Sequence, residues 1–259
     1  MSDYSFSTAA LFPLETEEAL ALIKQAGFEN AEIMPQAYSD VTEKSTLKFE
    51  KTGVQVASVH FPLVMFGFLY TPHRTMMQDG RDFSRALIKM GSRLGAKILV
   101  THAHKPDVPG YGHILEEPIL ENLRWLAGQC QDAGIVMAME NSAKTCATVE
   151  QLTGYIDILG HENIKPMVDI DHVHEAGGDP ADFLRRVKPC HLHLSDFKQG
   201  TTHLPLGEGE ADWPGIRSAI EGYSGFYTVE PSKKYYLKDT AAMLRRDYEF
   251  IRSVFEGSE

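Results

Sequence analysis

The chain has 259 residues, of which 43% are hydrophobic and 24% are charged. These proportions exclude the disordered and fibrous classes, and no apolar stretch approaches the roughly 20 residues that a membrane span needs. The formal net charge is −11, with 36 acidic against 25 basic residues, which disfavours nucleic acid as a partner because its binding depends mainly on cationic contacts to phosphates.

The three cysteines and the N-terminus bear on the compartment. Cys130, Cys146 and Cys190 are too few and too scattered for a disulfide framework and have no CxxC spacing. The segment Met1–Tyr4 is not a basic stretch followed by an apolar one, so no secretory signal is expected. We therefore expect a cytoplasmic protein with no membrane partner.

Short runs with the character of strands alternate with longer segments of helical period along the whole chain. The expected strands are Tyr4–Ala9, Ala31–Met34, Gln55–His60, Lys97–His102, Ile135–Glu140, Pro166–Ile170, Cys190–Leu194 and Tyr227–Glu230. The expected helices are Thr16–Gln25, Ser39–Lys51, Asp82–Leu94, Glu116–Asp132, Thr148–Leu159, Pro180–Val187, Trp213–Glu221 and Lys238–Phe255. Strands that are each followed by a helix predict a single (β/α)8 TIM barrel over residues 1–259. An open doubly wound sheet is the alternative, but no GxGxxG follows the first strand.

One long irregular segment, Pro62–Gly80, follows the third strand and is apolar and aromatic where a loop is usually polar. One interpretation is an extra packing layer or an oligomer contact, which leaves a homodimer or a tetramer open. The other is a lid that walls the mouth of the barrel.

Polar side chains stand at the ends of six expected strands. They are His60, His102, Glu140, Asp169, His193 and Glu230. In a closed barrel the carboxyl ends of the strands meet at one face, so these side chains are expected to converge. Each one alone is explained by a salt bridge or a helix cap, but convergent buried carboxylates and imidazoles are costly unless a cation neutralises them.

Four of these residues come from four consecutive expected strands, each about one βα unit apart. Glu140, Asp169, His193 and Glu230 supply three carboxylates and one imidazole. This donor set suits one divalent ion, Mn²⁺, Co²⁺, Mg²⁺ or Zn²⁺, and does not select among them.

The motifs that contain these residues form a recognisable series. They are Val59-His60, Met139-Glu140-Asn141, Asp169-Ile-Asp-His172, His193-Leu-Ser-Asp196, His203-Leu-Pro-Leu-Gly207-Glu-Gly209 and Val229-Glu230. The series resembles the xylose isomerase-like TIM-barrel superfamily, which holds sugar and sugar-phosphate isomerases and epimerases, inosose and dehydroshikimate dehydratase relatives, and the endonuclease IV group. The resemblance covers nearly the whole chain and is much less specific for the substrate than for the superfamily.

The resemblance implies roles for individual residues. It makes Glu140, Asp169, His193 and Glu230 the metal ligands, and Glu140 and Glu230 also the catalytic acid/base pair. It assigns His172 to contact with substrate oxygens, although a hydrogen bond to a ligand carboxylate explains this residue nearly as well. We place His60, His102 and His203 with it as substrate-binding residues.

Two positions depart from the patterns of the relatives. Ketose 3-epimerases usually carry a further glutamate six residues after the first ligand, and Cys146 stands there, which argues against a free-sugar 3-epimerase. The endonuclease IV pattern has nine metal ligands. Eight of its places are occupied here, whereas Thr201 replaces the ninth, an aspartate, and the acidic charge separately argues against DNA.

Lysines follow two of the site strands. Lys198 comes after the seventh strand, and Lys233 and Lys234 come after Glu230. They are either solvated surface residues or, in the functional interpretation that we adopt for Lys198, contacts to a substrate phosphate or carboxylate. If the strand registers are shifted by two residues, Asp171, His104, His174 and His191 replace their neighbours as ligands.

The sequence thus predicts a metal-dependent isomerase or epimerase of a sugar, sugar acid or sugar phosphate. A metal-bound carbonyl acidifies the neighbouring carbon-bound proton and stabilises the enediolate, and the carboxylates move the proton. A dehydratase or lyase at the same site, an endonuclease IV-like nuclease and a non-catalytic sugar-binding protein are the alternatives. The expected partner is a small carbohydrate.

Overall fold

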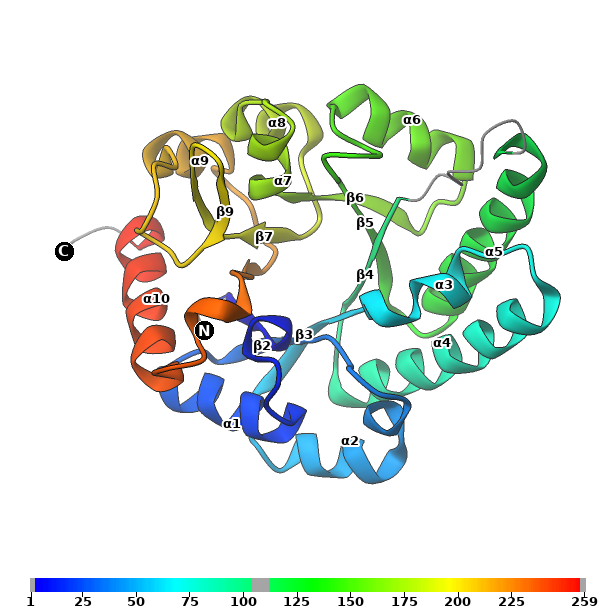
Figure 1. The fold of residues 1–259 in the computed structure, drawn as a ribbon, viewed down its shortest axis with the longest axis horizontal. Coiled ribbons are helices and arrows are strands. Elements are labelled where there is room, and N and C mark those ends of the chain that lie inside the picture. The colour runs from blue at the N-terminus through cyan, green and yellow to red at the C-terminus, as the bar shows by residue number, and fades with distance from the viewer. Residues whose placement is uncertain (1–2, 104–111, 257–259) are drawn as a thin grey trace.

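The computed structural model of the protein describes residues 3–103 and 112–256. Eight parallel strands close into a barrel in the order β1-β10-β7-β6-β5-β4-β3-β2, which confirms the predicted fold class (Figure 1). The strands are β1 (Tyr4–Ser7), β2 (Asn30–Ile33), β3 (Gln55–His60), β4 (Ile98–His102), β5 (Val136–Glu140), β6 (Ile164–Asp169), β7 (Leu192–Leu194) and β10 (Tyr227–Val229). The first and last of them pair in parallel, so the chain closes the barrel with its own two ends.

Helices surround the barrel on the outside (Figure 1). The longer ones are α1 (Thr16–Ala26), α2 (Glu43–Glu50), α4 (Arg74–Leu94), α5 (Gly112–Asp132), α6 (Val149–Leu159), α8 (Pro180–Val187), α9 (Trp213–Ala219) and α10 (Thr240–Phe255). The sequence marks their ends: Gly27 and Gly95 follow α1 and α4 in the left-handed conformation that glycine favours. Thr148 and Gln151 form a capping box at α6. None of these helices, within the described residues, is both long and apolar enough to cross a membrane.

Short helical turns occupy the loops. They are the helices α3 (Phe66–Leu69) and α7 (Ile170–Glu175) and the 3-10 turns η1 (Thr8–Leu11), η2 (Tyr38–Val41), η3 (Leu63–Met65) and η4 (Lys233–Tyr235). The predicted helix over Ser39–Lys51 is therefore divided into η2 and α2, because Thr42 is extended and caps α2.

The interior of the barrel has two different halves. A small apolar cluster fills it on the side of β4, β5 and β6, and its buried members are Ile98, Val100, Ala138 and Met167. The remaining strands carry the buried polar residues Ser5, Glu32, Ser58 and Thr228 instead, and buried His191 directly precedes β7. The large hydrophobic core lies outside the barrel, between strands and helices, so the barrel interior is free to hold a polar site.

The segment Pro62–Gly80 is more regular than we predicted. It forms η3, α3 and the start of α4, which begins at Arg74 because the His73 ring caps the backbone N–H of Met76. A Cβ at Gly80 would lie 2.4 Å from the carbonyl oxygen of Phe68, so α3 packs closely on α4. The prediction of an irregular loop was wrong because the periodic pattern of α4 was recognised only from Asp82 onward. The role of the segment as a lid or an oligomer contact stays a prediction.

A hairpin follows β7 in a stretch for which the sequence analysis predicted no strand. Its strands are β8 (Asp196–Lys198) and β9 (Thr201–Leu204), which pair antiparallel. The Asp196 carboxylate accepts hydrogen bonds from the backbone N–H groups of Phe197, Gly207 and Ala211 at 2.9 to 3.1 Å and from the Trp213 indole at 3.3 Å. One buried carboxylate therefore joins the start of the hairpin to the glycine turn and to α9.

Candidate metal centre

The four predicted ligands meet at the carboxyl end of the barrel. Glu140 ends β5, Asp169 ends β6, His193 lies in β7 and Glu230 directly follows β10. Each offers one ligand atom, and these atoms all lie within 4.8 Å of one another. The pairing of Asp169 beside His193 across β6 and β7 places their side chains on the same face of the sheet.

His193 lies between the two glutamates. Its Nδ1 atom is 2.7 Å from Oε2 of Glu230 and 3.3 Å from Oε1 of Glu140. Burial alone would lower the pKa of His193, but Glu230, Glu32 and Glu140 raise it well above the usual range. Burial alone would likewise raise the pKa of Glu140, but His102 and His193 hold it well below the usual range. This pocket therefore favours a positive charge between the carboxylates.

Asp169 uses one carboxylate oxygen to cap a helix and turns the other toward the cluster. Its Oδ1 accepts hydrogen bonds from the backbone N–H groups of Asp171 (2.7 Å) and His172 (3.4 Å), which caps α7. The Asn141 side chain accepts a hydrogen bond from the backbone N–H of Asp169 at 2.7 Å and donates one to the backbone carbonyl of Asp169 at 3.0 Å. Oδ2 is buried and has no hydrogen-bond partner among the described residues. A buried carboxylate oxygen without a donor fits a cation, and so does the set of three carboxylates and one imidazole.

Two histidines contact the other oxygen of Glu140. The Nε2 atoms of His60 and His102 lie 3.4 and 2.7 Å from Glu140 Oε2, and the three residues form a second group of potential ligands. His60 donates from Nδ1 to the Phe61 carbonyl at 2.7 Å. Burial opposes protonation of His60, but Glu140, Glu32 and Glu230 raise its pKa to about 9.

His172 and His203 form a third group with Asp169. His172 Nε2 lies 3.9 Å from Asp169 Oδ2 and 4.0 Å from Glu140 Oε1. His203 has a φ of 51°, and its backbone N–H donates to the buried Asp171 carboxylate. Ser195 donates to the same Asp171 oxygen at 2.9 Å. The four histidines that we assigned to substrate binding thus surround the four-residue cluster, with His203 on the hairpin.

The structure does not bring Lys198 into the cluster. Lys198 is exposed on β8, and no hydrogen bond or ion pair of its side chain occurs among the described residues. Lys233 and Lys234 lie over the rings of Phe12 (4.1 Å) and Tyr235 (4.8 Å). A surface role is enough to explain these three lysines.

Four further residues were alternative ligands in case the strand registers were shifted by two, and the described ones have other partners in the structure. Asp171 binds the hairpin, His191 contacts Glu32, and His174 stacks on Phe197 with ring centroids 4.0 Å apart. His104 lies outside the described residues. Cys146, which stands where 3-epimerases usually have a glutamate, is fully buried in the outer core, with its Sγ 3.7 Å from the Gln151 carbonyl.

Two residues at the site were missed by the sequence analysis. Ser7, at the end of β1, donates to Glu230 Oε1 at 3.0 Å. Glu32, near the end of β2, contacts both His191 and His193 and is completely buried. A glutamate inside the apolar run Ala31–Met34 is a signal for a buried charge, and it was available in the sequence.

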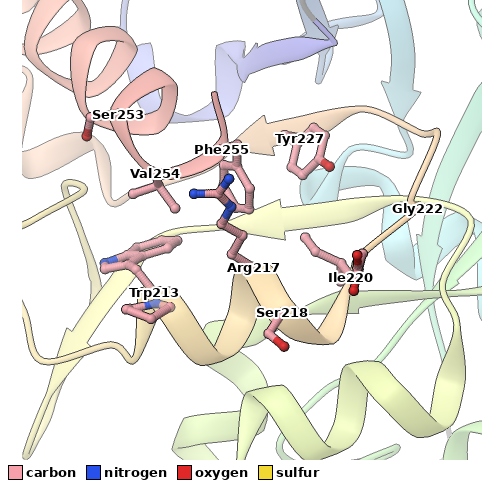
Figure 2. Close-up of a pocket in the computed structure, with 11 residues that line it drawn as sticks. Trp213, Arg217, Ser218, Ile220, Gly222, Tyr227, Ser253, Val254 and Phe255 are labelled. Atoms are coloured by element: carbon pink, nitrogen blue, oxygen red, sulfur yellow. The ribbon is translucent and has the colours of Figure 1, made fainter. Parts of the chain in front are cut away.

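A hollow of about 650 Å³ lies at the opposite end of β10 (Figure 2). It is lined by residues of α9 and α10 and by Tyr227, which begins β10, whereas Glu230 follows its last residue. Catalytic groups of such barrels gather at the carboxyl ends of the strands, so this hollow is separate from the candidate site.

The sequence matches the xylose isomerase-like TIM barrel family over residues 20–254, so the chain belongs to this family. The D-psicose 3-epimerase of Enterocloster bolteae is 27% identical over 120 residues, which cover 43% of this chain and only 38% of that enzyme. The structure of a D-tagatose 3-epimerase-like protein superposes with a TM-score of 0.80 at 17% identity, over 99% of this chain and 97% of that one. The probable 3-DHS dehydratase of Bacillus anthracis gives a TM-score of 0.75 at 13% identity, over 97% and 98% of the two chains. At these identities the two structures show a shared fold.

Proposed function

We propose that the protein is a metal-dependent isomerase or epimerase of a sugar, sugar acid or sugar phosphate. The observation that carries this proposal is the position of Glu140 and Glu230, whose carboxylates approach the same Nδ1 atom of His193 at 3.3 and 2.7 Å. A pair of carboxylates around one cation-binding point is what exchange of a carbon-bound proton requires.

Glu140, Asp169, His193 and Glu230 would hold one divalent ion. When bound, such an ion polarises a substrate carbonyl and makes the proton on the neighbouring carbon easier to remove. Two features fit this role: Oδ2 of Asp169, which lacks a hydrogen-bond partner in the part of the chain that the structure describes, and the fully buried imidazole of His193. Mn²⁺, Co²⁺, Mg²⁺ and Zn²⁺ all accept this donor set.

The two glutamates would move the proton. His193 and His60 help to lower the pKa of Glu230 against the effect of burial, and the pKa of Glu140 is low as well, so both are ionised bases near neutral pH. Glu140 ends β5 and Glu230 follows β10, and β6 and β7 separate these strands in the barrel order, so the two carboxylates would approach a bound substrate from two sides. One would remove the proton as a carboxylate, and the other, after it takes up a proton from solvent, would deliver that proton to the opposite face. His172 and His203, which are 19% and 27% exposed, are placed to contact substrate hydroxyl groups.

The relatives support a carbohydrate as the substrate, because the matched curated protein is named for epimerisation of D-psicose at carbon 3. The buried Cys146 argues for a different substrate, since its side chain is enclosed in the outer core. We therefore propose the reaction class and leave the substrate as a small polyhydroxylated carbonyl compound.

A nuclease is the second candidate, and one observation favours it. The groups around His60 and around His203 adjoin the central group and share Glu140 and Asp169 with it, as a site for several ions would require. The net charge of −11 opposes the approach of DNA. A dehydratase would use the same glutamates but expel water from the neighbouring carbon.

Metal content and proton exchange test the proposal together. We expect about one divalent ion per chain in the purified protein, and less in Glu230→Gln. We also expect incorporation of deuterium from D₂O next to the carbonyl of accepted ketoses, ketose phosphates or keto acids. This exchange should fall by a factor of about 10² to 10⁴ in Glu140→Gln and Glu230→Gln. Glu249→Gln, an exposed substitution on α10, is the matched control and should behave as the wild type.

Other outcomes decide between the candidates. Two or three zinc ions per chain with cleavage of DNA at abasic sites would replace the proposal by a nuclease. Loss of water without return of a proton would replace it by a dehydratase. An ion-free wild type that still binds a sugar would leave a non-catalytic binding protein.

A further inference from the structure

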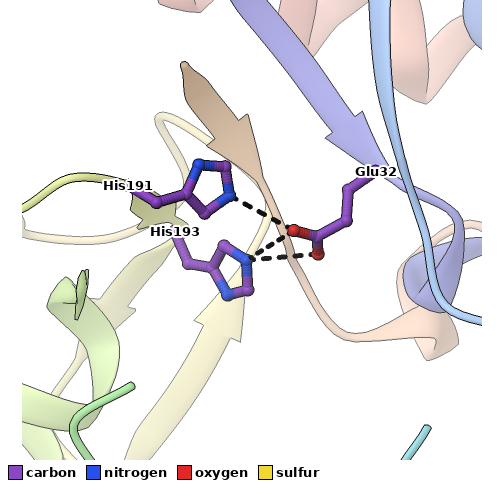
Figure 3. Close-up of side chains that lie close together, drawn as sticks. All are labelled: Glu32, His191 and His193. Carbon is purple, nitrogen blue, oxygen red and sulfur yellow. Dashed lines mark hydrogen bonds and ion pairs between the residues drawn. The ribbon is translucent and has the colours of Figure 1, made fainter. Parts of the chain in front are cut away.

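A second buried group lies directly beneath the candidate metal centre. Glu32, His191 and His193 are each 0% exposed, and their ligand atoms lie within 4.8 Å of one another (Figure 3). Glu32 comes from β2, whereas both histidines precede or lie in β7, and β1 and β10 separate these strands in the barrel. The Glu32 side chain therefore reaches across the interior to the imidazole that faces the cluster.

The contacts of Glu32 determine which nitrogen of His193 carries hydrogen. His193 Nε2 lies 3.2 Å from Oε1 and 3.3 Å from Oε2 of Glu32. An ionised carboxylate only accepts hydrogen bonds, so Nε2 must be the N–H donor. In the neutral ring, the form that binds a metal ion, the lone pair of His193 is then on Nδ1, the atom that faces Glu140 and Glu230.

Glu32 is itself fixed by further donors. Ser58, its partner in the register of β2 and β3, donates to Oε2 at 2.8 Å. His191 Nε2 lies 3.2 Å from the same oxygen and 3.3 Å from Thr228 Oγ1. The other nitrogen of His191, Nδ1, is buried and has no hydrogen-bond partner within the described part of the chain. His191 packs edge-on against the ring of His193, with centroids 5.5 Å apart, and its Nε2 side serves to hold the Glu32 carboxylate.

We propose that Glu32 is a positioning residue, which holds His193 as the Nε2–H tautomer and aims its Nδ1 lone pair at the cation. This inference rests on the proposed function, because it needs an ion at the four-residue cluster. Carboxylates that accept from a metal-binding histidine orient the ring and raise its basicity, and their loss typically lowers metal affinity about 10- to 100-fold. Ser58 and His191 take part by keeping Glu32 in place.

The test compares Glu32→Gln with the wild type, using Co²⁺ as the probe. The amide keeps the shape of the side chain but offers an N–H₂ group that competes for the same position, so the Nε2–H tautomer loses its preference. We expect one Co²⁺ per chain in both proteins, with about 10- to 100-fold weaker binding in the variant by competition with a chelator. The visible absorption of bound Co²⁺ should change as well, since it reports the ligand geometry.

Two controls separate positioning from folding. Asp247→Asn removes another fully buried carboxylate, on α10, which has no contact with the cluster, and should change the Co²⁺ affinity by less than about twofold. If Glu32→Gln fails to fold, Ser58→Ala provides the second test, because it removes one donor to Glu32 and keeps the charge. The ¹⁵N chemical shifts of His193 in the Zn²⁺-bound wild type should show a protonated Nε2 and a metal-bound Nδ1, and Ser58→Ala should bind Co²⁺ more weakly than the wild type.

The outcomes are distinguishable. A wild type that binds no Co²⁺ would overturn the proposed function and the role of Glu32 with it. A wild type that binds one Co²⁺, with the same affinity and spectrum in Glu32→Gln, would overturn only the role of Glu32. A second ion per chain that disappears in Glu32→Gln would make Glu32 a ligand and would contradict the positioning role.

Discussion

Ser7 and Glu230 lie 223 residues apart in the chain and are joined by a hydrogen bond of 3.0 Å from the serine Oγ to Oε1 of the glutamate. The bond depends on the closure of the barrel, in which β1 pairs with β10 and Phe6 lies beside Val229. It leaves the other oxygen of Glu230, Oε2, facing His193. The orientation of a proposed catalytic base is therefore set by the strand at which the chain begins.

Replacement of Ser7 by alanine is expected to lower kcat/KM about 10- to 150-fold, because a hydrogen bond to a charged group contributes about 1.5 to 3 kcal/mol. Ser5→Ala is the matched control. Ser5 is buried on the same strand, but its Oγ has no hydrogen-bond partner among the described residues, so kcat/KM should stay within about twofold of the wild type. Steady-state kinetics of both variants on the same substrate check this pair. Equal losses in the two variants would mean that the bond to Glu230 has no special role.

Removal of divalent ions is expected to lower the melting temperature. When the free ion concentration is 100 times the dissociation constant, binding to the folded state adds about 2.7 kcal/mol of stability. For a chain of this size that raises the melting temperature by roughly 5 to 10 °C. Scanning calorimetry with excess Mn²⁺ and with excess chelator measures the difference. In Glu230→Gln the difference should shrink. A melting temperature that is the same in both solutions would argue against an ion at the cluster.

The chain order of the strands and the four-residue cluster were predictable from sequence, because both depend on local patterns. Parallel strands end at the same face of a barrel, so a polar residue at each strand end was enough to bring Glu140, Asp169, His193 and Glu230 together. The limits of β3 were also predictable, since Gly53 precedes it and Pro62 follows it.

The residues that were missed act across the barrel rather than along the chain. Glu32 and His193 are in contact although they lie 161 residues apart in the sequence, and no local pattern contains that contact. Ser7 lies inside the expected strand Tyr4–Ala9, so it was not among the polar residues recognised at strand ends. The hairpin at Lys198 and Thr201 was not predicted because its strands are only 3 and 4 residues long and its polar residues match turn composition. Lys198 was assigned by its place in the chain, whereas its side chain is exposed.

Gly209→Ala is expected to destabilise the protein by about 2 to 3 kcal/mol, which is typical of overpacking. A Cβ at this position would lie 2.3 Å from both Asp196 Oδ1 and the Phe197 carbonyl oxygen, so the hairpin would have to shift. Gly154→Ala is the control: nothing lies within 4 Å of its Cβ position in α6, and alanine there should stabilise by about 0.5 to 1 kcal/mol. Urea unfolding measures both. No loss of stability in Gly209→Ala would contradict the close approach to Asp196.

Asp247 is expected to make stability depend on pH. Burial raises the pKa of Asp247 to about 7 from 3.8, against the opposing effects of Tyr236 and Arg246. The folded state therefore binds a proton that the unfolded state has already lost, and this contribution to stability disappears as the pH rises from about 4 to 7. Between about pH 5 and pH 8 the free energy of unfolding should fall in the wild type. Asp247→Asn has no carboxyl group at this position, so its free energy of unfolding should fall by about 2 to 3 kcal/mol less over the same range.

The other titrating groups are present in both proteins, so their contributions to the pH dependence cancel when the wild type and Asp247→Asn are compared. The groups that face Asp247 are Tyr236, which donates to Oδ2, and Arg246, which in turn pairs with Glu208. Asparagine keeps an oxygen for the backbone N–H of Leu206, which donates to Oδ1 at 3.1 Å. Parallel pH profiles of the two proteins would show that Asp247 is ionised throughout this range.

The hydrogen bonds that the Asp196 carboxylate accepts have a further consequence for ligand binding. This carboxylate connects the beginning of the hairpin, at Phe197, to Gly207, Ala211 and Trp213. The two ends of the segment that carries His203 are therefore held together by hydrogen bonds to one side chain. The conformational entropy of this segment is lost when the chain folds. A ligand that meets His203 does not have to order the hairpin first, and the affinity for that ligand is not reduced by a cost of loop ordering.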